Sequence, residues 1–102
     1  MSTELTREEV DGMAGMVLLE FGATWCHHCQ AIQPELERLL GQFPQIHHIK
    51  VEDGRGKPLG RSFRVKLWPT LVLMRDGQVI RALVRAGDAV IREALEEFAG
   101  QQ

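Results

Sequence analysis

The chain is built around one stretch, Phe21-Gly22-Ala23-Thr24-Trp25-Cys26-His27-His28-Cys29-Gln30-Ala31-Ile32-Gln33-Pro34. An apolar run at residues 16–19 precedes it, and apolar positions at helical spacing continue through residues 31–40. This pattern predicts a buried strand, a tight loop and then a helix. Both cysteines of the protein lie at the join between strand and helix.

The spacing of Cys26 and Cys29 suits reversible disulfide formation. Residues three apart on a helix share a face, with Cβ atoms roughly 5–6 Å apart, and a disulfide needs a Cβ separation of about 3.8 Å. A modest tightening of the first turn would close the bond. The free N–H groups and the dipole at a helix N-terminus stabilise a thiolate at Cys26. Cys29, one turn deeper, can then attack a mixed disulfide, so the stretch predicts a dithiol switch.

These residues resemble the thioredoxin family. The resemblance lies in Trp25-Cys26-x-x-Cys29 after an apolar strand and in Pro34 five residues later. It continues in Val-Lys-Leu-Trp-Pro-Thr-Leu-Val-Leu-Met at residues 65–74, Asp-Gly at 76–77 and a glycine at 87 before a last helix. It extends over residues 6–98 and implies an α/β thioredoxin fold, with a central mixed β-sheet flanked by helices on both faces.

The same resemblance implies an activity and its partners. Thioredoxin-like proteins are thiol–disulfide oxidoreductases that act on protein disulfide substrates and need no bound cofactor. They receive electrons from a donor such as a thioredoxin-reductase-type enzyme. The expected reaction here is therefore thiol–disulfide exchange, with Cys26 attacking and Cys29 resolving.

Length and composition set the outer limits. A chain of 102 residues, 44% hydrophobic and 25% charged, is typical of one globular domain, residues 1–102. A net charge of −2 argues against nucleic acid as a partner. No apolar run approaches the roughly 18 residues of a membrane span, and the first residues lack the pattern of a signal peptide. We therefore expect a cytoplasmic monomer. Two cysteines exclude a disulfide framework.

Local patterns predict the other elements. Thr6 and Glu9 fit a capping box for a helix from Arg7 to about Met13. Pro58 suits the first turn of a short helix. The remaining expected elements are a strand at 16–21, a strand at 46–51, a hairpin of strands 70–74 and 78–84 through Asp-Gly at 76–77, and a last helix capped by Asp88.

Glu20 interrupts the apolar strand before the cysteines. It could be a strand-end carboxylate that points to water. The resemblance favours another role, because thioredoxins carry an acid here, beneath the second cysteine, as its proton acceptor. Most of them carry Asp, whereas this chain has the longer Glu. His48 follows the alternation of strand 46–51; it could pair with Glu20 or remain a solvated histidine.

Pro69 is the second catalytic element that the resemblance implies. The matching proline of the family is cis and lies against the two cysteines. Its lack of an N–H leaves the carbonyl and N–H of Trp68 to pair with an extended substrate. Trp25, Trp68 and Gly87 are assigned to substrate binding. Gly22 stands where thioredoxins usually have an aromatic residue, so one wall of the binding groove is expected to be missing.

The two residues between the cysteines are the main departure from thioredoxin, which has Gly-Pro where this chain has His27-His28. A histidine before the second cysteine resembles protein disulfide isomerases and periplasmic disulfide oxidases. A protonated His28 would stabilise the Cys26 thiolate and hence the reduced form. This predicts a protein less reducing than thioredoxin.

Three alternatives stay open. The two cysteines and two histidines of this stretch could bind zinc or an iron–sulfur cluster, although one Cys-x-x-Cys supplies only two ligands within a chain. A binding module without catalysis is also conceivable. Finally, a run of cations without an acid among them is either a solvated face or a positive rim that steers acidic partners; its members are Arg55, Lys57, Arg61, Arg64 and Lys66.

Overall fold

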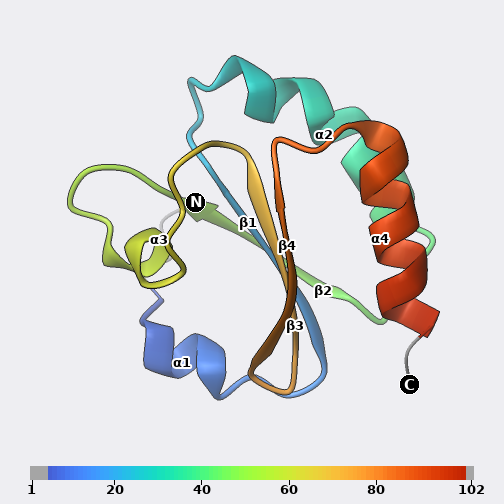
Figure 1. Cartoon of the computed structure of the whole chain (residues 1–102), viewed down its shortest axis with the longest axis horizontal. Coiled ribbons are helices and arrows are strands. Elements are labelled where there is room, and N and C mark those ends of the chain that lie inside the picture. The colour runs from blue at the N-terminus through green and yellow to red at the C-terminus, as the bar shows by residue number, and fades with distance from the viewer. Residues whose placement is uncertain (1–4, 101–102) are drawn as a thin grey trace.

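A four-stranded sheet lies at the centre of the computed structural model, which describes residues 5–100 (Figure 1). The elements in chain order are α1 (Arg7–Asp11), β1 (Met16–Gly22), α2 (His27–Leu40), β2 (His47–Glu52), α3 (Pro58–Ser62), β3 (Thr70–Arg75), β4 (Gln78–Val84) and α4 (Asp88–Gly100). Within residues 5–100, no helix has the length and apolar character needed to cross a bilayer.

The strand order is β2-β1-β3-β4. β1 and β2 are parallel, whereas β1–β3 and β3–β4 are antiparallel, so the predicted mixed sheet is confirmed. Phe21 near the end of β1 pairs with Thr70 at the start of β3. The segment after β1, which carries the two cysteines, and the segment before β3, which carries Pro69, therefore lie at the same end of the sheet.

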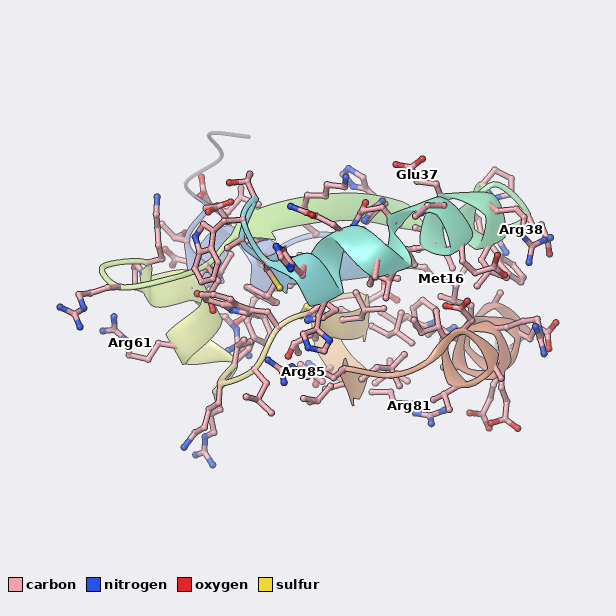
Figure 2. The ribbon with its side chains drawn as sticks, turned by 90° about the horizontal axis from the view of Figure 1, so that it is seen from above. Met16, Glu37, Arg38, Arg61, Arg81 and Arg85 are labelled. Atoms are coloured by element: carbon pink, nitrogen blue, oxygen red, sulfur yellow. The ribbon has the colours of Figure 1, made fainter. Side chains whose placement is uncertain are left out.

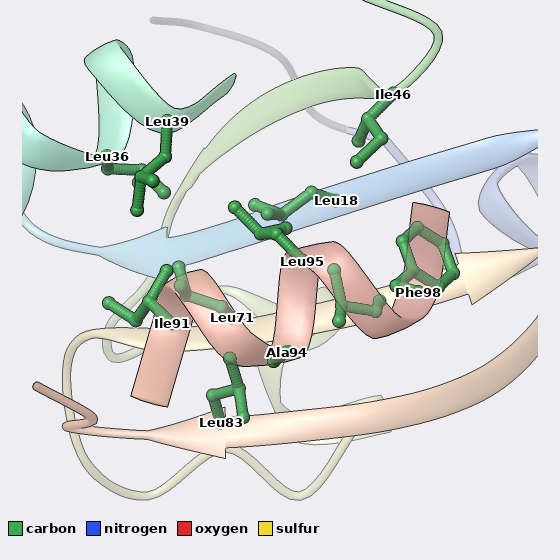
Figure 3. Packing of buried hydrophobic residues seen from close by; sticks show 11 residues of the cluster. Leu18, Leu36, Leu39, Ile46, Leu71, Leu83, Ile91, Ala94, Leu95 and Phe98 are labelled. Carbon is green, nitrogen blue, oxygen red and sulfur yellow. The ribbon is translucent and has the colours of Figure 1, made fainter. Parts of the chain in front are cut away.

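Helices cover both faces of this sheet. Because successive strand side chains point to opposite faces, Leu18 and Leu71 pack with α2 and α4, whereas Val17 and Val72 belong to a second cluster on the side of α1 and α3. Figure 3 shows the first cluster, in which α4 packs over the strands. Its residues from α4 recur at helical spacing and so form one face of that helix: Ile91, Ala94, Leu95 and Phe98.

Local chemistry explains most element boundaries. The predicted capping box of Thr6 and Glu9 is present, but α1 ends at Asp11, before the expected Met13; Gly12 is its C-cap, and the Gly12 N–H donates to the carbonyls of Glu8 and Glu9. The Asp-Gly hairpin is confirmed, since both turn residues have positive φ, 50° at Asp76 and 82° at Gly77.

Candidate active site

The two cysteines are free thiols at the start of α2, and both are buried. Cys26 is the N-cap of the helix, and its sulfur accepts a hydrogen bond from the backbone N–H of Cys29 at 3.2 Å. The first turn of α2 contains no acidic residue. The positive end of the helix dipole therefore acts on the Cys26 sulfur without a neighbouring carboxylate in that turn.

Pro69 lies in the segment before β3, directly after Trp68. The Trp68–Pro69 peptide bond is cis, and Pro69 is buried. Trp68 packs on the small cluster that Ala23 forms with the two cysteines. The hydroxyl of Thr70 donates to the carbonyl of Leu67 at 2.6 Å, which closes the loop around the proline.

Glu20 is a buried acid beneath the site, with 5% of its surface exposed. Its Oε1 lies 2.7 Å from Nε2 of His48, so of the two alternatives left open for His48 the structure shows the pair with Glu20. Its Oε2 accepts a hydrogen bond from Nε2 of Gln33, and the same nitrogen donates to the carbonyl of Cys29 at 3.2 Å. Gln33 thus connects the acid to the backbone of the second cysteine.

A cavity of about 140 Å³ lies between the acid and the second cysteine. Buried side-chain oxygens of Gln33 and Glu52, both lining residues, have no hydrogen-bond partner among the described residues. A polar space of this size can hold water, which can carry a proton between groups that do not touch. The lining residues are Glu20, Gly22, Ala23, Thr24, Cys29, Gln30, Gln33, Lys50, Val51 and Glu52.

The environment of Cys29 disfavours its ionised form. Burial is the main cause, and the hydrogen bond with the Cys26 thiol and the negative charges of Cys26 and Glu20 add to it; together they raise the pKa of Cys29 from 9.0 to about 11. At neutral pH Cys29 is therefore a thiol, which must lose a proton before it can act as a nucleophile.

Cys26 opens on a different space, an outer groove of about 540 Å³ that we call the dithiol groove. Trp25, with 68% of its surface exposed, and Trp68 meet edge to face across 5.3 Å between ring centroids. Gly87 does not line this groove; it lies exposed before α4 and accepts a hydrogen bond from the N–H of Ile91. The lining residues are Trp25, Cys26, His27, His28, Lys66, Leu67, Trp68 and Arg85.

Arg85, which the sequence analysis did not single out, lies beside the proline loop. Its Nε donates to the carbonyl of Trp68 at 2.7 Å, and its backbone N–H donates to the carbonyl of Pro69 at 2.9 Å. The carbonyl of Trp68 thus already has one partner, in contrast to the expectation that it is free. The Trp68 indole N–H donates to Asp53 at 2.9 Å.

The metal alternative lacks a ligand set. Among residues 5–100, no group of three or more His, Cys, Asp or Glu side chains is arranged to hold a metal ion. His27 and His28 are exposed on the first turn of α2, whereas Cys29 is buried. Neighbouring helix positions point in different directions, so these side chains do not converge with the sulfurs.

One sulfur of this dithiol lines a groove, and the other lines a cavity together with a buried acid. Thiol–disulfide oxidoreductases react through a dithiol of this kind, and this chain has the thioredoxin fold of that class. The family model described as thioredoxin matches residues 2–99. The chain belongs to the thioredoxin family.

Comparisons with individual proteins also identify thioredoxins as relatives of this chain. The chain is 36% identical over 70 residues to thioredoxin-2 of Pyricularia oryzae, covering 69% of this chain and 41% of that one. It is 27% identical over 82 residues to mitochondrial thioredoxin-3 of Saccharomyces cerevisiae, covering 80% and 65%. It thus spans less than two thirds of either relative. The solved structure of reduced thioredoxin 2 from Pseudomonas aeruginosa PAO1 is 47% identical, with a TM-score of 0.83 over 100% of both chains.

Proposed function

We propose that this protein reduces disulfide bonds of protein substrates, with Cys26 as the nucleophile and Cys29 as the resolving thiol. One observation carries the assignment: Cys26 lines the dithiol groove, whereas Cys29 lines the cavity next to Glu20. A substrate disulfide can reach the first sulfur from outside. The second sulfur faces the group that can take its proton.

The reaction runs in two exchanges. The Cys26 thiolate attacks one sulfur of the substrate disulfide, so that a mixed disulfide forms and the first substrate thiolate leaves. Cys29 then gives its proton to Glu20, directly or through water, and attacks the Cys26 sulfur. The second substrate thiolate leaves and the Cys26–Cys29 disulfide closes. The substrate has gained two electrons, and a dithiol donor such as a thioredoxin-reductase-type enzyme must return them.

Trapping of the mixed disulfide tests this order. Cys29→Ser should accumulate a covalent complex with a disulfide-containing protein, because the first attack succeeds and resolution is absent. Cys26→Ser should form no such complex at neutral pH, where Cys29 is protonated. Non-reducing gels with and without dithiothreitol detect the complex. Complexes that form with Cys26→Ser instead would reverse the two roles.

We further propose that His28 makes the protein less reducing than thioredoxin. Its exposed ring lies in the first turn of α2 and lines the groove with Cys26. An imidazolium there stabilises the thiolate of the reduced form, and the disulfide has no matching anion, so the reduction potential rises.

Replacement of His28 tests this role. Pro is tolerated at this position of a helix, so His28→Pro should lower the potential by about 20–40 mV, equivalent to about 1–2 kcal/mol. A glutathione redox titration measures the change. His28→Gln, which removes the charge without restricting the backbone, should move the potential in the same direction. If both variants keep the original potential or raise it, His28 has no part in the redox balance.

The cytoplasm is the compartment we propose. The chain has no cysteine besides this pair, so no structural disulfide calls for an oxidising compartment. A protein that works as a reductant needs a compartment whose thiol pool keeps this pair reduced. Alkylation of cysteines in intact cells, followed by fractionation, would report both the location and the redox state. A pair found oxidised in an exported fraction would contradict the proposal.

A further inference from the structure

The dithiol groove continues into a second hollow on the side of α3. This α3 hollow, of about 290 Å³, shares Lys66 and Trp68 with the groove, so the two form one continuous surface. Figure 2 shows Arg61 extending from the α3 side and Arg85 nearer to the start of α2. The residues that line the α3 hollow are Asp53, Gly54, Arg55, Lys57, Arg61, Val65, Lys66 and Trp68.

This surface is strongly cationic although the protein as a whole has a net charge of −2. Within residues 5–100, none of its five cations forms a salt bridge with a carboxylate. Asp53 is the one acid among the lining residues, and its carboxylate accepts the Trp68 indole N–H. The five cations are Arg55, Lys57, Arg61, Lys66 and Arg85.

Apolar side chains lie where this cationic surface meets the nucleophile. Trp25 and Leu67 are 68% and 48% exposed, and both line the groove with Cys26. A substrate segment that reaches the sulfur therefore meets apolar contacts first and positive charge beyond them. Exposed charge pairs add little binding energy each, but a charged cleft of one sign raises the rate at which an oppositely charged partner associates.

We propose that this surface selects protein substrates whose reactive cysteine is flanked, on one side, by acidic residues. The cysteine meets Cys26, and the Asp or Glu side chains of the segment lie along Lys66 and Arg61 toward α3. This inference rests on the proposed disulfide reduction and adds the chemical class of its substrates.

Matched peptide disulfides test the proposal. Three peptides carry the same cysteine, apolar neighbour and leaving thiol, and differ only in a flank of Glu, Ser or Lys. The reduced protein should react with the Glu peptide about tenfold faster than with the Lys peptide at low salt. The ratio should approach one near 1 M salt, where the Debye length is roughly 3 Å. The measured quantity is the second-order rate constant of leaving-thiol release.

Two variants with the same change in net charge test whether the preference for acidic peptides depends on the α3 hollow. Arg61→Glu changes the charge of the α3 hollow, whereas Arg92→Glu changes the protein's charge equally on α4, outside both hollows. Arg61→Glu should lower the Glu-to-Lys rate ratio clearly, whereas Arg92→Glu should keep it near the original value. Equal loss in both variants would mean that only net charge matters, which overturns the proposal.

A small uncharged disulfide separates this inference from the proposed function. If the reduced protein cleaves 4,4′-dithiodipyridine but reacts equally with all three peptides, disulfide reduction stands and the acidic preference is wrong. If it reacts with neither the small disulfide nor the peptides, the proposed function fails, and this inference fails with it. Faster reaction with the Lys peptide also overturns it.

Discussion

At the scale of single residues, Cys29 must lose a proton before it can react, and Glu20 is the nearby acid that lines the same cavity. The thiol of Cys29, with a pKa of about 11, is almost fully protonated at neutral pH, yet resolution needs its thiolate. Glu20 is 5% exposed and held on both oxygens, by His48 and by Gln33. A carboxylate fixed in this way beside a cavity that also reaches Cys29 is placed to act as a general base.

Replacement of the acid should separate the two exchanges. Glu20→Gln keeps the size of the side chain and removes its basicity, so resolution should slow by about 10²–10⁴-fold while the first attack at Cys26 stays unchanged. Rapid-quench single-turnover experiments measure both steps. Equal rates in the variant and the wild type for both steps would remove Glu20 from the mechanism.

The pH dependence gives an independent test of the same pair. Below a pKa of about 11 the thiolate fraction of Cys29 rises about tenfold per pH unit. Resolution in Glu20→Gln should therefore accelerate steeply as pH rises from 7 toward 10, because direct ionisation replaces the missing base. The wild type should depend less on pH over this range. A variant whose resolution rate is flat with pH would contradict this explanation.

Among the elements, the end of β1 and the start of α2 approach each other closely. A Cβ on Gly22 would lie 2.6 Å from the sulfur of Cys29, which is closer than real contacts allow. The chain lacks the aromatic residue usual in thioredoxins at this position, and here the cysteine sulfur occupies the space next to the glycine. A side chain at position 22 must displace the resolving thiol.

Gly22→Ala should therefore lower the free energy of unfolding of the reduced form by about 1–3 kcal/mol, as overpacking in a buried site does. It should also slow resolution, because the sulfur moves away from its position beside Glu20. Urea unfolding and single-turnover kinetics measure the two effects. Gly100→Ala is the control, since a Cβ there meets nothing within 4 Å. Similar behaviour of both variants would show that the close approach has no consequence.

The sequence predicted elements better than the contacts between them. Thr6 with Glu9 and Asp76 with Gly77 act through their own neighbours, so their structures could be read from local patterns. Gln33–Glu20, Trp68–Asp53 and Arg85–Trp68 join residues 13, 15 and 17 positions apart, and their pairing depends on how helices and loops pack on the sheet.

Arg85 is the clearest example of a site residue that local sequence patterns do not predict. The resemblance directed attention to Gly87, and nothing in the sequence marks Arg85, because positive φ favours glycine. The structure instead gives Arg85 a φ of 50° and bonds it to the proline loop on both its backbone and its side chain. A residue whose conformation runs against its own preference, and is held by distant partners, leaves no local signal.

In the whole molecule, the hydrophobic core and the dithiol site are formed by different residues. The two large apolar clusters lie on opposite faces of the sheet, whereas Ala23 and the cysteines form a small cluster of their own at the strand ends. Leu95 of α4 is fully buried in the cluster shown in Figure 3 and belongs to neither wall of the dithiol groove. Its packing should therefore act on the reduced and the oxidised form alike.

Leu95→Ala tests this separation. Loss of a fully buried leucine side chain should lower the free energy of unfolding by about 2–5 kcal/mol in both redox forms. The difference in stability between the forms fixes the potential of the folded dithiol relative to that of the unfolded chain, and 30 mV corresponds to about 1.4 kcal/mol. The glutathione redox titration should therefore return an unchanged potential, in contrast to His28→Pro. Losses that differ between the forms by more than about 1 kcal/mol, or a potential shift above about 20 mV, would show that the core and the dithiol are energetically coupled.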